Sequence, residues 1–224
     1  MSENKLIKQL EEVLPEGMTL PKELKMLYEW IESKGFYVDS ADYRCGTLYD
    51  DEAMRASWTD EHREGGTIIE FSASGQPFMM DWFGENVEGA EEIAQRLCIF
   101  AESGGEGSQC ALWKADDGSI KVVHLGSGSG SMLTCVLADN FVDFLRLLAI
   151  GYDEICWDEE FPYPPNEGVE QEVFVEPNVA FQQWVVETFN TTIPKTALEI
   201  VKHPAGMDDE ASEDAFFNWY VKFF

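Results

Sequence analysis

Four short apolar segments in the middle of the chain constrain its fold more than any other feature. They are residues 97–102, 109–114, 120–125 and 132–137. Each is rich in β-branched, aromatic or cysteine residues, as is typical of strands, and turn-forming residues such as Asp117-Gly118 separate them. Parallel strands are joined by crossovers of roughly a dozen residues or more, so the short links here predict an antiparallel meander.

Apolar residues at helical spacing predict helices on both sides of this meander. Before it, we expect a strand over residues 67–71 and helices over residues 6–14, 21–34 and 88–96. After it, we expect helices over residues 140–150, 178–189 and 212–221. Asn140 suits a helix N-cap, whereas Gly35 and Gly151 suit helix ends. Residues 36–66 show no pattern that places elements.

The balance of charge excludes two classes of partner. The chain has 43 acidic and 15 basic residues, which gives a formal net charge of −28 at pH 7. Nucleic acids and anionic membranes are bound mainly through clustered lysine and arginine, so we expect no nucleic acid and no membrane as partner. Hydrophobic residues make up 45% of the 224 residues, which is enough to build a core and argues against disorder.

The N-terminal sequence and the spacing of the cysteines favour a cytoplasmic protein. The N-terminal sequence Met-Ser-Glu-Asn-Lys lacks the basic start and apolar run of a secretory signal, and no apolar stretch approaches the ~20 residues that span a bilayer. The 5 cysteines are scattered and contain no Cys-x-x-Cys pair. We therefore expect reduced, structural cysteines in a cytoplasmic protein.

No pattern of catalytic or metal-binding residues emerges. His62, His124 and His203 lie in different segments, and none has the spacing of a zinc site with another histidine or a cysteine. His124 is the best lone candidate for a general base, although a structural role is the favoured interpretation. The run Gly126-Ser-Gly-Ser-Gly130 leads into a strand, which favours a flexible turn over a phosphate-binding loop. We therefore predict a protein that is not an enzyme and uses no metal or cofactor, with a hydrolase as the less favoured alternative.

The composition changes after Gly151. From there on the chain has 16 acidic and 3 basic residues, a net charge of 3 − 16 = −13. We therefore expect an α+β domain over residues 1–151 and an acidic helical extension over residues 152–224. The extension carries apolar helix faces, so we expect it to dock on the domain.

An aromatic residue within a dense acidic run predicts a partner-binding patch, because buried aromatic anchors carry much of the energy of protein interfaces. The patch consists of Asp153, Glu154, Trp157, Asp158, Glu159, Glu160 and Tyr163. Packing of Trp157 against the domain is an equally acceptable interpretation of the same sequence.

Two stretches of the domain follow a characteristic order of strands, turns and helix. Residues 97–113 read Leu-Cys-Ile-Phe-Ala-Glu-Ser-Gly-Gly-Glu-Gly-Ser-Gln-Cys-Ala-Leu-Trp, a strand, a glycine-rich turn and a strand that ends in an aromatic residue. Residues 120–151 continue with strand, turn, strand and a Phe-Leu-rich helix, and residues 20–28 form an early Leu-Pro helix. Together they resemble the SUKH superfamily, which includes the yeast cell-wall glucan-synthesis regulator and many bacterial proteins.

The resemblance covers about residues 20–151 and implies an α+β fold without catalytic residues. The fold it implies is a central, mostly antiparallel sheet of about 4–6 strands flanked by helices. Many bacterial members of the superfamily look like immunity proteins, which bind and neutralise a cognate toxin that is often a nuclease. A nuclease must hold phosphates and is therefore basic, so an acidic inhibitor would be steered onto it. We expect such an immunity protein; an intracellular interaction module like the yeast regulator is the alternative, and the oligomeric state stays open.

Overall fold

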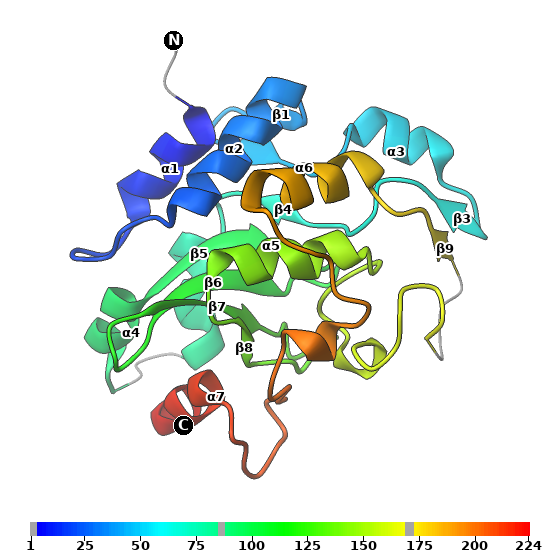
Figure 1. Ribbon diagram of the computed structural model, residues 1–224. Helices are drawn as coiled ribbons and strands as arrows, with labels where there is room; N and C mark the ends of the chain where they lie inside the picture. The colour runs from blue at the N-terminus through cyan, green and yellow to red at the C-terminus, as the bar shows by residue number, and fades with distance from the viewer. Residues whose placement is uncertain (1–3, 85–87, 169–172) are drawn as a thin grey trace.

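A seven-stranded sheet runs through the centre of the molecule, with its strands in the order β1-β2-β4-β5-β6-β7-β8 (Figure 1). The computed structural model describes residues 4–84, 88–168 and 173–224, so the first three residues of the N-terminal sequence considered above lie outside it. The strands are β1 (Tyr37–Asp39), β2 (Arg44–Gly46), β4 (Glu70–Phe71), β5 (Leu97–Glu102), β6 (Gln109–Lys114), β7 (Ile120–Leu125) and β8 (Val136–Ala138). Neighbouring strands are antiparallel throughout. This confirms the α+β class, with more strands than the roughly four to six that we expected.

The predicted meander is present as β5, β6, β7 and β8. The first three of these strands have the predicted bounds. The fourth is shorter than predicted because the backbone of residues 132–134 pairs with residues 205–207. Leu133 forms a β-bridge with Gly206, and the Thr134 amide donates a hydrogen bond to the Ala205 carbonyl at 2.6 Å. The C-terminal part of the chain therefore covers the sheet edge beside β8.

The sheet buries apolar side chains on both of its faces. In β5, Cys98 and Phe100 belong to one apolar cluster and Leu97 and Ile99 to the other, because successive side chains of a strand point to opposite faces. All four are completely buried. Strands covered on both faces carry continuous apolar runs, and this is why the meander is visible in the sequence.

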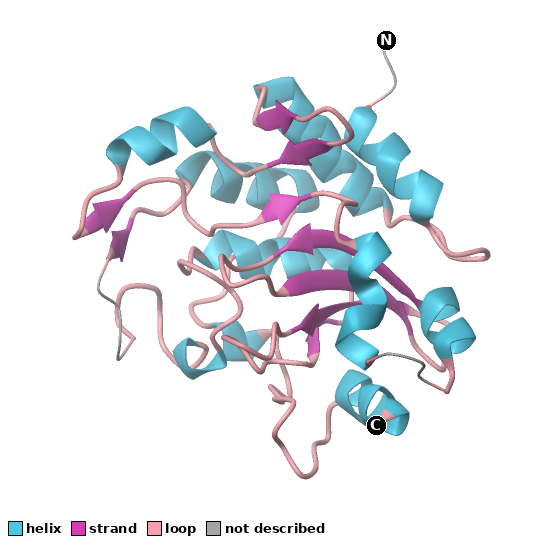
Figure 2. Cartoon of the chain, turned by 180° about the vertical axis from the view of Figure 1, so that it is seen from behind, coloured by secondary structure: helices cyan, strands magenta, loops and turns pink. Residues whose placement is uncertain are grey.

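Helices form a layer on each face of the sheet (Figures 1 and 2). The face with Phe100 is covered by α1 (Lys5–Val13), α2 (Lys22–Lys34), α5 (Phe141–Ile150) and α6 (Val179–Phe189). The opposite face is covered by the 3₁₀ helix η1 (Gln76–Phe83), α4 (Ala90–Arg96) and α7 (Ala215–Tyr220). Three shorter 3₁₀ helices are η2 (Asp158–Glu160), η3 (Ala197–Glu199) and η4 (Val221–Phe223). Within the described ranges, no helix combines the length and apolar character that crossing a membrane requires.

Residues at the helix ends act as the sequence predicts. The side-chain oxygen of Asn140 accepts a hydrogen bond from the Asp143 amide at 3.0 Å and so caps α5. Gly35 ends α2 and Gly151 ends α5, with φ of 75° and 98°, in the left-handed region that favours glycine. The helices expected over residues 21–34 and 140–150 are thus confirmed to within one residue at either end.

The chain after Gly151 packs on both faces of the sheet. On one face, the ring of Trp184 in α6 lies 5.4 Å from that of Trp30 in α2. On the other face, the ring of Trp219 in α7 lies 5.7 Å from that of Trp113 in β6. The acidic segment therefore shares both apolar clusters with the rest of the chain.

The segment without a clear pattern, residues 36–66, folds into short elements. They include β1, β2 and the helix α3 (Asp51–Ser57). They also include β3 (His62–Arg63), which pairs in parallel with β9 (Phe174–Val175) as a separate two-stranded sheet. A strand of two residues leaves no periodicity to detect, and its partner lies far along the chain. This small sheet positions the candidate site.

Candidate functional site

Two residues of the predicted patch, Asp153 and Glu154, use their carboxylates for contacts within the chain. The Asp153 carboxylate pairs with Arg63 of β3, whose side chain is completely buried. One Glu154 oxygen accepts a hydrogen bond from the Gly105 amide at 2.7 Å, and the other accepts one from the Trp157 indole at 2.9 Å. These two carboxylates hold neighbouring loops together and have little capacity left for a partner.

The rest of the predicted patch lies on η2 and in the connector after it. Phe161 is completely buried and anchors this turn in the core. Trp157 and Glu160 are partly exposed, and Tyr163 is 39% exposed. Asp158 and Glu159, the first two residues of η2, are exposed. The side chains most available to a partner are therefore these two carboxylates and the Tyr163 ring.

Asp158 and Glu159 belong to a wider group of carboxylates. Partial removal of water raises the pKa of Asp158, and repulsion from Glu159, Asp209 and Asp208 raises it further. Two hydrogen bonds bring Asp208 and Asp209 towards Asp158, although they are distant in the sequence: the Met207 amide donates to the Met132 carbonyl at 2.8 Å, and the Ser131 hydroxyl donates to the Cys156 carbonyl at 2.6 Å. Asp208 and Asp209 are exposed as well. We call Asp158, Glu159, Asp208 and Asp209 the η2 acidic surface.

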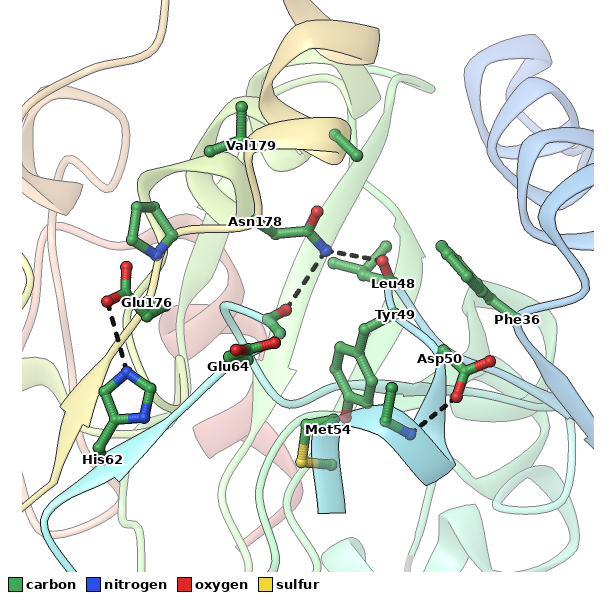
Figure 3. A pocket seen from close by; sticks show the side chains of 14 residues that line it. Phe36, Leu48, Tyr49, Asp50, Met54, His62, Glu64, Glu176, Asn178 and Val179 are labelled. Atoms are coloured by element: carbon green, nitrogen blue, oxygen red, sulfur yellow. Dashed lines mark hydrogen bonds and ion pairs between the residues drawn. The ribbon is translucent and has the colours of Figure 1, made fainter. Parts of the chain in front are cut away.

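A groove of about 540 Å³ opens between α3, β3 and the turn that joins β9 to α6 (Figure 3). We call it the α3/α6 groove. Aromatic and apolar side chains come from Phe36, Tyr49 and Met54. Tyr49 and Met54 are buried, and burial raises the pKa of Tyr49 above its ordinary value. The groove thus has an apolar floor with polar groups around it.

Asn178 joins the three segments that form the groove. Its side-chain oxygen accepts a hydrogen bond from the Phe181 amide at 3.0 Å and caps α6. Its side-chain nitrogen donates to the Leu48 carbonyl at 2.7 Å and to the Gly65 carbonyl at 3.3 Å, as the dashed lines in Figure 3 show. One amide therefore holds the start of α6 against the segment before α3 and the turn after β3.

Exposed and partly exposed aromatic rings lie on β3, on β9 and at the end of α3. His62 and Phe174 are paired across the two strands, and their rings stack at 6.2 Å with an angle of 9° between the planes. Trp58 is 45% exposed and Phe174 is 49% exposed. His62 Nε2 lies 3.3 Å from a carboxylate oxygen of Glu176, which also lines the groove. Rigid aromatic rings beside carboxylates are suitable material for a protein interface.

His124, the residue considered as a general base, is completely buried in the meander. Its Nδ1 donates to the Leu133 carbonyl at 2.7 Å, and this leaves Nε2 to accept from the Ser103 hydroxyl at 2.8 Å. Burial lowers the pKa of His124 to about 4, so the ring is neutral near pH 7. These contacts fit the structural role that the sequence favoured.

The cysteines are free thiols, and all except Cys45 are buried. Burial raises the pKa of Cys98 and of Cys110 to about 12, which keeps both thiols protonated near neutral pH. In the part of the chain that the structure describes, histidine, cysteine and carboxylate side chains do not gather in threes that could hold a metal ion.

Comparisons with known proteins identify no relative of this chain. A scan against protein-family models finds no matching family. Searches of curated proteins and of solved structures also find no match. The resemblance to the SUKH superfamily therefore stays a prediction, and the geometry of the chain itself is the basis for proposing a function.

Sequence patterns do not predict the α3/α6 groove. Its acidic groups, Asp50, Glu64 and Glu176, come from segments that the pairing of β3 with β9 and the hydrogen bonds of Asn178 bring together. A partial signal exists in Asp50 and Asn178, since both residue types commonly cap helices and both do so here. Such a signal places a helix start, but it does not show that two helix starts face one groove.

Proposed function

We propose that this protein is a non-catalytic binding protein for a basic protein partner, in the manner of an immunity protein that neutralises a toxin. The observation that carries the proposal is the η2 acidic surface on an anchored turn. Asp158 and Glu159 are exposed, Asp208 and Asp209 lie near Asp158, and the buried Phe161 holds the turn in place. A preformed surface binds with a smaller loss of conformational entropy than a flexible acidic tail.

The net charge of −28 attracts a basic partner towards this surface from a distance. Complementary charge raises the rate of association by roughly 10- to 1,000-fold at low ionic strength. A nuclease toxin binds phosphates with lysine and arginine, so carboxylates can take the place of phosphates on it. An acidic inhibitor of such an enzyme therefore both finds its target quickly and blocks the substrate channel.

A charge reversal at η2 tests this proposal. The variant Asp158→Lys/Glu159→Lys is compared with Glu12→Lys/Glu16→Lys, which changes the net charge equally at exposed positions near α1. The ligand is the purified toxin encoded beside the gene for this chain, and association is followed by stopped-flow fluorescence at low salt. We expect the η2 variant to associate at least about tenfold more slowly than the α1 variant. Equal rates for the two variants would remove η2 from the interface.

The range of partners separates this proposal from the alternative of an intracellular scaffold. One tightly bound basic protein supports the immunity function. Binding of several unrelated proteins with similar affinity would support the scaffold. Turnover of a metabolite by the purified chain would contradict both functions, because each assumes binding without catalysis.

A further inference from the structure

The α3/α6 groove is strongly anionic for its size. Asp50, Glu64 and Glu176 line it, and all three residues are exposed. Among the described residues that line it there is no lysine or arginine, and His62 is its one side chain that could become cationic. A volume of about 540 Å³ falls within the range of roughly 300–1,000 Å³ that is typical of sites for small ligands.

The carboxylates of the groove have unused capacity for hydrogen bonds. The Glu64 carboxylate accepts no hydrogen bond from any residue that the structure describes, and Figure 3 shows it among the lining side chains. Glu176 uses one oxygen for His62, at 3.3 Å. Asp50 uses one oxygen to accept from the Ala53 amide at 2.8 Å, where it caps α3. Each of these three carboxylates therefore keeps at least one oxygen that is free to accept a hydrogen bond from a ligand.

Positive fields near the groove are too weak to cancel these charges. The starts of α3 and α6 face it, and a helix N-terminus carries about half a positive charge, which the caps at Asp50 and Asn178 reduce further. Two arginines also lie near Tyr49. Arg55 is paired with Asp51 at 2.8 Å, and Arg63 is paired with Asp153. Three full negative charges in the groove therefore dominate.

The apolar lining selects among cations. Phe36 and Tyr49 supply aromatic rings, and Met54 supplies a polarisable side chain. A guanidinium group is flat and weakly hydrated, so it stacks on such rings better than an ammonium group does, and it binds carboxylates through paired hydrogen bonds. The same chain already uses this contact elsewhere, since the Arg44 guanidinium lies 3.6 Å from the centre of the Tyr37 ring.

We propose that the α3/α6 groove binds the guanidinium side chain of an arginine presented by the partner. Its guanidinium lies against the aromatic lining of the groove and bonds to Glu64 and Glu176. This inference rests on the proposed function for the source of the arginine. It also makes the groove a second contact, apart from the η2 acidic surface.

An NMR titration tests the groove without any partner protein. The full chain is titrated with Nα-acetyl-arginine amide and, separately, with Nα-acetyl-citrulline amide, which has nearly the same shape but no charge. We expect saturable shifts of the backbone amides of Gly65, Val179 and Ala180 with the arginine probe only. In Glu64→Gln/Glu176→Gln we expect binding at least about tenfold weaker, whereas Glu12→Gln/Glu16→Gln should bind as the unchanged chain does.

Equal shifts with citrulline, or equal affinity in the groove variant, would overturn the inference. If the double variant loses its native spectrum, Glu64→Gln alone replaces it, because that carboxylate is exposed and has no partner among the described residues. The two proposals can fail separately. A chain that binds the arginine probe but no basic toxin contradicts the proposed function alone, and a chain that binds the toxin but shows no shift with the probe contradicts the groove alone.

Discussion

Arg63 and Asp153 form an ion pair that joins two parts of the chain 90 positions apart. The Arg63 side chain is completely buried, whereas the Asp153 side chain is 39% exposed. The guanidinium also donates to the Glu64 carbonyl at 3.0 Å, at the edge of the α3/α6 groove. This pair fixes the acidic segment after α5 to β3, so the groove and the predicted patch share one structural support.

The asymmetry of the pair predicts unequal effects of removing each partner. Asp153→Asn leaves a buried guanidinium without its counter-charge and should lower the free energy of unfolding by about 3 kcal/mol. Arg63→Met leaves a carboxylate that water can reach and should cost clearly less, about 1 kcal/mol. Urea denaturation of the two variants measures the difference. An equal or larger loss in Arg63→Met would show that the hydrogen bond to Glu64, and not the charge pairing, stabilises this region.

Asn178 should contribute more to stability than an ordinary helix cap does. Asn178→Ala removes the cap of α6 and two hydrogen bonds to other segments, so we expect a loss of about 2 kcal/mol. The matched variant Asn140→Ala removes a cap without such contacts and should cost about 1 kcal/mol. Chemical denaturation compares the two. Equal losses would mean that the contacts of Asn178 with Leu48 and Gly65 do not stabilise the groove.

The packing of α7 predicts that the C-terminal segment is part of the folded core. Trp219 is 2% exposed and donates to Glu92 at 2.9 Å, so Trp219→Ala should lower the free energy of unfolding by about 3–5 kcal/mol. Val38→Ala, at a residue that is 57% exposed, serves as control and should change it by less than about 0.5 kcal/mol. A small effect of Trp219→Ala, together with a separate early transition, would show that α7 unfolds independently.

The buried His124 predicts a specific dependence of stability on pH. Its pKa is about 4 in the folded chain and 6.5 in a free side chain, so the unfolded state binds more protons between these values. Its contribution is complete above pH 6.5 and is lost as the pH falls towards 4, by about 3 kcal/mol in all. His124→Gln should therefore lose less stability than the unchanged chain over this range. Parallel pH profiles of the two proteins would contradict a neutral, buried His124.

The middle of the sheet, from β5 to β7, and most of the helices could be predicted because their signals are local. In β5, β6 and β7 an apolar run ends at a turn, and both features lie within a few residues of each other. The same holds for α5, which begins at Asn140 and ends at Gly151. The exposure of Asp158 and Glu159 is likewise a local feature, because acidic residues in one short run favour solvent.

The groove could not be predicted, because nothing near its residues in the sequence specifies their meeting. Glu64 and Glu176 come together through two-residue strands that pair in parallel. Long-range contacts of these strands, such as the ion pair of Arg63 with Asp153 and the burial of Val175, hold the pair in place. The internal contacts of Asp153 and Glu154 could not be predicted for the same reason, because their partners Arg63 and Gly105 lie far away in the sequence, in β3 and in the turn between β5 and β6. Local residue order thus specifies the elements of this protein. Which carboxylates hold the fold together and which face a partner depends on long-range packing, since a charge takes its role from the groups that surround it in space.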